Sequence, residues 1–167
     1  MTWDEGLEKH GRERMVSIDV LRQCELFTDL NDEELGKIAH ICCEETHEPQ
    51  EVVCGESEVA EKVYILEEGR VAVQMHLRSD LEPNGDVTIE EVTPGQIFGW
   101  SALVRQRRFT ASVRALEKVR VIAIEGSDLN ALFEEDSHIG FVVMKRLADV
   151  ISSRLRRTRQ QLGEASH

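Results

Sequence analysis

The sequence has few aromatic residues and few cysteines for its length. Aromatic side chains make up 5% of its 167 residues, so a core must rest mainly on Val, Ile, Leu and Ala. The four cysteines are too few and too unevenly spaced to suggest the disulfide framework of a secreted domain. They are Cys24, Cys42, Cys43 and Cys54. We therefore expect a reducing, cytoplasmic location.

Long apolar runs and clustered positive charge are also missing. No stretch approaches the roughly 18 apolar residues of a membrane helix, and residues 1–14 lack the apolar core of a targeting peptide. The net charge is −12, and DNA binding needs clustered Lys and Arg. After the short basic run at 154–159, only residues 160–167 remain, too few for a two-helix DNA reader. We expect no membrane association and no direct DNA binding by this chain.

Motifs of catalytic and metal sites are absent from the sequence as well. It contains no nucleophile elbow, phosphate-loop lysine or zinc-protease pattern. Two histidines and three cysteines fall within residues 40–54, but without C-x-x-C or H-x-x-x-H spacing. Acidic pairs such as Glu67-Glu68 are interpreted as solvated turns. We therefore predict neither an enzyme nor a metal site.

The helical parts of the chain are predicted at its two ends. Ser17 as a cap indicates a short first helix. Asn31 with Glu34 three residues later indicates a second, which we expect to end near Cys43. Helical periodicity returns behind Ser127 as a cap, and a longer helix is expected over residues 137–162.

The middle of the chain alternates in short apolar runs separated by glycine turns, which is typical of strands. Strands are predicted at residues 52–54, 63–66, 71–75, 87–89, 97–98, 110–113 and 121–124. Seven or eight short strands at this spacing indicate a sandwich or a roll. At 41% hydrophobic composition, one core and one domain are expected.

The C-terminal helix carries a stripe whose members are alternately four and three residues apart, the spacing of a seam between two helices. A homodimer through this stripe is one interpretation. The other is that the stripe packs against the protein's own strands. The stripe consists of Met144, Ala148, Ile151, Leu155, Thr158 and Leu162.

Three segments carry a resemblance to a known family. They are Leu26-Phe27 with Leu30 and Glu34-Leu35, the run VYILEEGRV at 63–71, and the run PGQIFGWSAL at 94–103. Together with the element order they resemble the cyclic-nucleotide-binding domain family, which includes the cAMP receptor protein and the regulatory subunits of protein kinase A. The resemblance implies an α+β fold, an antiparallel, double-stranded, jelly-roll-like β-roll flanked by N-terminal helices and a long C-terminal helix. The domain is expected at 17–162, after an extension at 1–16 and before a tail at 163–167.

The run at 94–103 looks like the start of the family's phosphate-binding cassette, which would end with the run TASVRA at 110–115. The resemblance implies an acidic residue after Phe-Gly for the ribose and an arginine before the Ala-Ala or Ser-Ala pair for the cyclic phosphate. Trp100 and Phe109 stand at these two places. Arg107 and Arg108 lie just upstream, and a one-residue shift on a strand reverses the face of a side chain. Arg108 would thus reach the pocket only through a corrected register.

The candidate ligand-binding residues are the cassette positions and one threonine of the long helix. Two aromatics in one pocket suit a stacked base, an apolar ligand or no ligand. The threonine is included because the cAMP receptor protein has a base-contacting threonine three residues after an Arg-Leu pair; it fits a polar seam position equally. The candidates are Phe98, Gly99, Trp100, Ser101, Ala102, Arg107, Arg108, Phe109, Thr110, Ala111 and Thr158.

The predicted function is a regulatory module that senses a cyclic nucleotide or another small effector through a degenerate cassette and signals through its C-terminal helix. No other cofactor is assigned. A homodimer and a signalling partner protein are expected. The alternatives are a protein-interaction scaffold with the same fold and no nucleotide ligand, or the sensor fragment of a transcription regulator.

Overall fold

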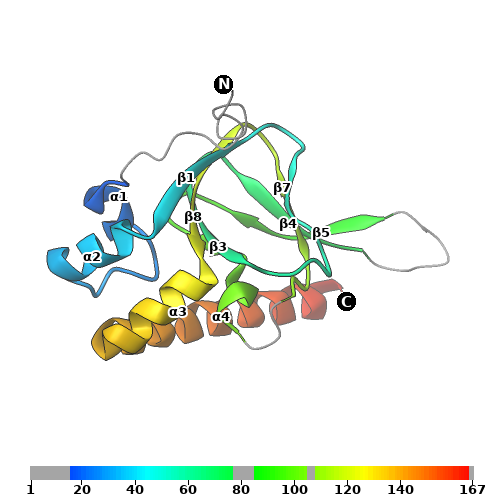
Figure 1. The fold of residues 1–167 in the computed structure, drawn as a ribbon. Coiled ribbons are helices and arrows are strands. Elements are labelled where there is room, and N and C mark those ends of the chain that lie inside the picture. The colour runs from blue at the N-terminus through cyan, green and yellow to red at the C-terminus, as the bar shows by residue number, and fades with distance from the viewer. Residues whose placement is uncertain (1–15, 77–84, 105–107, 166–167) are drawn as a thin grey trace, which may run out of the picture.

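Two four-stranded antiparallel sheets and the helices packed on one of them make up the computed structural model, which describes residues 16–76, 85–104 and 108–165 (Figure 1). The helices are α1 (Ile18–Arg22), α2 (Asp32–Ala39), the 3-10 helix η1 (Trp100–Leu103), α3 (Gly126–Glu135) and α4 (Ser137–Ala165). The strands are β1 (Cys42–His47), β2 (Val52–Cys54), β3 (Lys62–Glu68), β4 (Val71–His76), β5 (Asp86–Val92), β6 (Ile97–Phe98), β7 (Ser112–Ala115) and β8 (Val119–Glu125).

The strand order is that of a roll. One sheet runs β1-β8-β3-β6 and the other β2-β7-β4-β5, so strands distant in sequence lie side by side in both. In Figure 1, α3 and α4 lie below the strands, and α1 and α2 lie beside the β1 end. The predicted fold class, helices flanking an antiparallel β-roll with a long helix at the C-terminal end, is confirmed.

The surroundings of strand β3 explain why its sequence is almost continuously apolar. Successive side chains of a strand point to opposite faces. Val63 and Ile65 pack in the core beneath the helices, whereas Tyr64 and Leu66 pack in the core between the two sheets. Strand β8 alternates in the same way. Strands β3 and β8 are therefore buried on both faces.

The predicted starts of the first two helices are confirmed. The Ser17 hydroxyl accepts a hydrogen bond from the backbone of Asp19 at 3.2 Å. At α2, the Asn31 side chain accepts from the Glu34 N–H at 2.9 Å, and the Glu34 carboxylate accepts from the Asn31 N–H at 3.1 Å. This reciprocal capping box satisfies two N–H groups that a helix leaves unpaired at its start.

Three boundaries of the predicted elements differ from those of the structure. The second helix ends at Ala39, and residues 42–47 form the edge strand β1, paired with β8. Cys42 therefore lies on a strand and not on a helical stripe, because pairing with β8 outweighed an ambiguous local pattern. Helix α3 begins at Gly126, and its N-cap Glu125 lies two residues before the predicted cap at Ser127. Helix α4 continues to Ala165, into the predicted tail.

Candidate functional site

A cavity of about 250 Å³ lies between the roll and the C-terminal half of α4. We call it the roll cavity. Residues of β4, β5 and β7 form one part of its wall, the chain around η1 forms another, and α4 closes it. It is lined by Val73, Ile89, Glu90, Phe98, Gly99, Trp100, Ser101, Phe109, Thr110, Ala111, Val113, Ile151, Arg154, Leu155 and Thr158.

Eight of the eleven candidate ligand-binding residues line this cavity: Phe98, Gly99, Trp100, Ser101, Phe109, Thr110, Ala111 and Thr158. Ala102 does not line it and is buried in the core between the sheets. Arg108 is exposed outside it, where its guanidinium Nη1 donates to the Ser57 carbonyl at 2.8 Å. No corrected register brings Arg108 inward, and its neighbour Phe109 faces the cavity instead. Arg107 lies outside the described residues.

Gly99 makes the turn from β6 into η1. Its φ of +75° lies in the left-handed region, which a glycine adopts without the strain of a Cβ. A Cβ there would also lie 3.1 Å from Tyr64 Cδ2 and 3.2 Å from the Lys62 carbonyl oxygen. The Tyr64 ring in turn stacks on Phe98, with ring centroids 5.0 Å apart. The start of the cassette segment is thus fixed by close packing on β3.

Aromatic surface occupies the two places where the family resemblance implies a carboxylate and an arginine. Trp100 is half-buried, lines the roll cavity and also packs against the core beneath the helices. Phe109 is buried and lines the same cavity. The guanidinium carbon of Arg154 lies 4.8 Å from the Trp100 ring centroid, a cation–π contact that holds the indole against α4.

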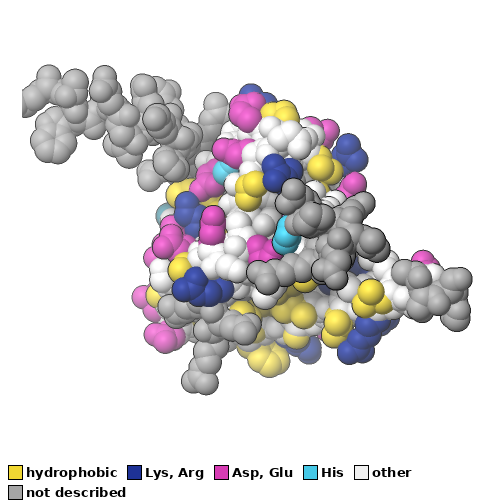
Figure 2. Space-filling model, turned by 90° about the vertical axis from the view of Figure 1, so that its right-hand side faces the viewer, with side chains coloured by type: hydrophobic (Ala, Val, Ile, Leu, Met, Phe, Trp, Pro, Cys, Tyr) yellow, Lys and Arg dark blue, Asp and Glu magenta, His cyan; other side chains and the backbone are white. Residues whose placement is uncertain are grey.

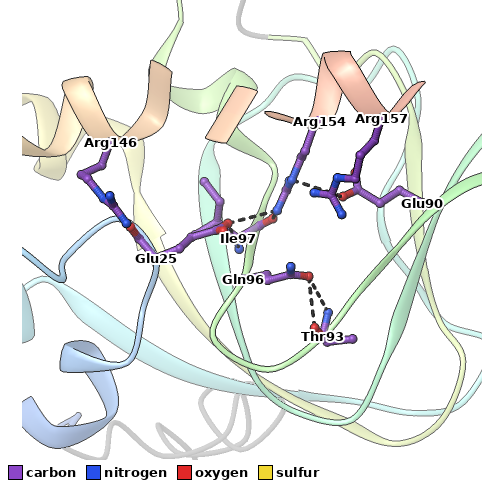
Figure 3. A network of polar contacts seen from close by, with 8 residues as sticks. All are labelled: Glu25, Glu90, Thr93, Gln96, Ile97, Arg146, Arg154 and Arg157. Carbon is purple, nitrogen blue, oxygen red and sulfur yellow. Dashed lines mark hydrogen bonds and ion pairs between the residues drawn. The ribbon is translucent and has the colours of Figure 1, made fainter. Parts of the chain in front are cut away.

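Arg154 is the centre of a polar network that joins α4 to the cassette (Figure 3). The side chain is only 5% exposed. Its Nη2 donates to the Ile97 carbonyl at 2.6 Å and to Glu25 Oε1 at 3.1 Å. Glu25 Oε1 also accepts from the Ile97 N–H at 3.0 Å. Both backbone polar groups of Ile97, two residues before Gly99, are therefore held by one residue of α4 and one of the N-terminal segment.

On its other side Arg154 faces a carboxylate of β5. Its Nε lies 3.3 Å from Glu90 Oε1, and Arg157 Nη2 lies 3.3 Å from the same oxygen. These are ion-pair distances, but Arg154 Nε, Arg154 Nη1 and Glu90 Oε1 lack a hydrogen-bond partner among the described residues. Burial lowers the pKa of Arg154, while Glu90 and Glu25 oppose this. An arginine stays charged under such conditions, so the network holds a cation between two carboxylates.

The stripe of α4 is divided between the cavity and the surface. Ile151, Leu155 and Thr158 line the cavity. Met144 is 39% exposed and Leu162 66% exposed, and Ala148 is exposed as well. The Thr158 hydroxyl donates to the Arg154 carbonyl at 3.0 Å within the helix, which leaves its oxygen free to accept a further bond.

Arg154, Glu90 and Glu25 were missed by reasoning from the sequence. Arg154 follows Ile151 by three residues and precedes Thr158 by four, so helical periodicity places all three on one face. That spacing could have found it. No local pattern marks Glu25 or Glu90, which meet Arg154 only through the fold.

The described part of the chain also bears on three other possibilities: a metal site, a reactive thiol and a membrane-spanning helix. The described residues contain no group of three His, Cys, Asp or Glu side chains placed to hold a metal ion. Burial raises the pKa of the Cys24 and Cys42 thiols to about 12, so neither is a reactive thiolate at neutral pH. None of the described helices is both long and apolar enough to cross a membrane.

A family comparison decides what kind of domain this is. The family model described as "Cyclic nucleotide-binding domain" matches residues 44–136, which span the roll and α3. The chain belongs to this family. The expected resemblance is therefore confirmed, and the roll cavity lies inside the matched family domain except for its α4 wall.

Solved structures support the same assignment. A protein of Geobacter metallireducens that carries the name cyclic nucleotide-binding protein is 33% identical, and the match covers 84% of this chain and 99% of that one, with a TM-score of 0.71. The catabolite activator protein of Thermus thermophilus shares the fold at 21% identity and a TM-score of 0.70, over 85% of this chain and 63% of that one.

Among curated proteins, the cAMP-dependent protein kinase type II regulatory subunit of Drosophila melanogaster is 28% identical over 86% of this chain and 36% of its own length. This chain spans between 26% and 36% of the curated relatives it matches. The match therefore covers only part of each of these longer proteins.

Proposed function

We propose that this cyclic nucleotide-binding domain is a regulatory, non-catalytic module that binds a small effector in the roll cavity and signals through the C-terminal half of α4. One observation carries the proposal. The cavity is lined by the chain around Gly99 on one side and by Ile151, Leu155 and Thr158 of α4 on another. A ligand between them contacts both, and it shifts the position of α4 by as much as its affinity differs between two helix positions.

The cassette is proposed to be degenerate, so cAMP and cGMP should bind weakly. Arg154 is the only arginine or lysine among the described lining residues, and two carboxylates already surround it. Loss of the ribose carboxylate and the phosphate arginine removes two charge-assisted contacts, each about 1.5–3 kcal/mol, or together about a hundredfold or more in affinity. Isothermal titration with both nucleotides measures this. Sub-micromolar binding would contradict the degenerate cassette but not the regulatory role.

Sensing itself is tested by closing the cavity. A thermal-shift screen of cyclic nucleotides and small metabolites first finds ligands that stabilise the wild type. Ala111→Leu adds volume to the cavity wall and should abolish their stabilising effect. Ala131→Leu, on the exposed face of α3, is the matched control and should retain it. Hydrogen exchange along α4 should change on binding in the wild type and the control only.

A homodimer through α4 belongs to the same proposal, together with a cytoplasmic location and a signalling partner protein. The exposed members of the α4 stripe support the dimer, and Phe141, which is 66% exposed, extends the stripe by one step at its start. Figure 2 shows hydrophobic side chains gathered along the lower side of the molecule, the side on which α4 lies in Figure 1. A 3–4 spacing of apolar residues is the pattern of helices that pair with helices.

The same exposed surface favours the second candidate, a protein-interaction scaffold with an empty cavity. The two functions differ in the screen described above. The scaffold is the better explanation if no small molecule stabilises the wild type and if Ala111→Leu leaves the association of the protein through α4 unchanged.

A further inference from the structure

The charge of the roll cavity carries an inference about the class of ligand. Among the described residues that line it, only Glu90 and Arg154 are charged, and their charges are opposite. The described part of the lining therefore has no net charge, and its one cation faces a carboxylate of the same wall. Polar and charged groups are costly to bury unless an opposite charge or a hydrogen bond compensates them.

The surroundings of Arg154 strengthen this argument. Glu25 Oε1 lies 3.1 Å from its Nη2, and Glu90 Oε1 lies 3.3 Å from its Nε. A ligand anion that reached this guanidinium would be the third negative group around one positive charge. Arg157 also pairs with Glu90, but its side chain is 54% exposed, so water screens its charge. The positive charge of Arg154 is therefore already neutralised by the protein's own carboxylates.

The rest of the wall is mostly apolar and partly aromatic, with Trp100 and Phe109 beside Ile151 and Leu155. Such surfaces suit the ring of a small molecule. Arg154 Nη1 has no acceptor and Glu90 Oε1 no donor among the described residues, and both atoms are buried, so a ligand reaches them only when these side chains turn toward the cavity. An uncharged amide, or an equivalent ring edge, carries one donor and one acceptor, which are the two kinds of partner that this pair lacks.

We propose that the roll cavity selects uncharged, ring-containing ligands with a small polar group and rejects their anionic analogues, and that Glu90 sets this selectivity by neutralising Arg154. The inference rests on the proposed effector-binding function. It names the chemical class of the effector: an aromatic amide or a similar neutral heterocycle, and not a nucleotide phosphate or an aromatic acid.

The test uses pairs of probes that share a shape and differ in charge: phenylacetamide with phenylacetate, and indole-3-acetamide with indole-3-acetate. Binding is followed by protein-observed NMR, and for the phenyl pair also by fluorescence in a Trp3→Phe background, which leaves Trp100 as the remaining one of two tryptophans. Millimolar affinities are expected for probes of this size. Each amide should bind about tenfold or more tightly than its acid, because the acid meets like charge.

Glu90→Gln tests the assigned residue, since it removes one of the two carboxylates that neutralise Arg154. It should bring the affinity of each acid up to or above that of its amide. Glu91→Gln is the matched control on the same strand: Glu91 pairs with Arg70 at 3.6 Å and does not line the cavity. It should keep the wild-type preference. If Glu90→Gln does not fold, the double variant Glu90→Gln with Arg154→Gln restores a wall of zero charge and should prefer the amides.

Four results would overturn the inference. If an acid binds the wild type with the same affinity as its amide, the proposed selectivity is wrong, but the proposed binding of an effector is not contradicted. A preference that changes equally in Glu90→Gln and Glu91→Gln, or that is lost in the double variant, removes the role of Glu90. If neither probe pair binds, the inference fails; the proposed function fails separately, only if the metabolite screen also finds no ligand.

Discussion

The two halves of α4 are held to the protein in different ways. In the first half, Ile139, Val143 and Leu147 are almost fully buried in the core beneath the helices. In the second half, Arg154 is the one buried side chain of residues 151–164. Ile151 is half-buried and Leu155 is 48% exposed, and both line the roll cavity. The first half is fixed by apolar packing, and the second by a polar network around a cavity.

This difference indicates where the helix can move. Apolar packing is close to crystalline density and tolerates little displacement. Arg154 Nε and Nη1 have no hydrogen-bond partner in the described part of the chain. Such a network is easier to rearrange, because a new arrangement can satisfy groups that the present one does not. The second half of α4 is therefore the part that a ligand in the cavity can displace, with the first half as its anchor.

The largest effect is expected from removing a buried apolar side chain in the first half of α4. Ile139→Ala should lower the free energy of unfolding by about 4 kcal/mol, because it leaves a cavity in a fully buried site. Leu155→Ala, also a reduction to alanine but at a half-exposed site, should cost less than about 1.5 kcal/mol. Urea denaturation of both variants measures the difference. Equal losses would show that the two halves are packed alike.

A smaller effect is expected from removing Arg154, the centre of the polar network in the second half of α4. Arg154→Met leaves Glu25 without its cation and should cost about 3 kcal/mol, the typical result of breaking a buried ion pair on one side. Hydrogen exchange should then increase in the second half of α4 and not in the first. Arg157→Met is the control, because its exposed pair should contribute less than about 1 kcal/mol. Faster exchange along the whole helix would contradict the division into halves.

The extent of α4 and most strands could be predicted from the sequence, because these elements follow local periodicity. Helix α4 was expected over 137–162 and spans Ser137–Ala165, and β1 was the strand that was missed. Its alternation is weak, and its pairing with β8 joins residues that are between 72 and 82 positions apart, from His47↔Val119 to Cys42↔Ile124. Long-range pairing of this kind leaves little trace in a local window.

The cavity wall was predicted as far as the family resemblance reached. The positions from Phe98 to Ser101 and from Phe109 to Ala111, which the cassette resemblance singled out, line the roll cavity, and their role in ligand binding stays a prediction. The Arg154 network was not predictable, because Glu25 and Glu90 come from separate elements and meet only after the roll closes. Charged residues in a sequence give no indication of which of them will be buried together.

The exposed part of the α4 stripe allows a dimer test that leaves the cavity intact. Met144→Asp with Leu162→Asp should give a monomer by light scattering, because a charge in a paired seam forfeits the burial of each side chain, about 1.5–3 kcal/mol. Ile151→Asp with Leu155→Asp should also give a monomer but would disturb the cavity, which these residues line. Light scattering that shows a wild-type monomer at high micromolar concentration would contradict the dimer.

The smallest effect is expected from a titrating pair on the sheet that carries the anchored half of α4. On β1, His47 Nε2 lies 3.1 Å from Glu45 Oε2, and Lys62 Nζ lies 2.8 Å from Glu45 Oε1. The hydrogen bond with His47, followed by that with Lys62, lowers the pKa of Glu45 to about 2 despite its burial. The hydrogen bond with Glu45 raises the pKa of His47 above its usual value, again despite burial.

The two shifts define a pH window. A lowered carboxylate pKa contributes stability that is complete above its unfolded value of about 4.3 and is lost as the pH falls toward 2. A raised histidine pKa contributes stability that is complete below its unfolded value of about 6.5 and is lost as the pH rises through the folded value. His47→Gln should therefore lower stability near pH 5.5 by about 0.5 kcal/mol and have less effect at pH 9. Denaturation at both pH values measures this difference. Hydrogen exchange in the second half of α4 should be the same in the variant and the wild type, because the pair lies on the sheet that carries the first half. A change in that exchange would mean that the two halves of α4 are coupled through the sheet.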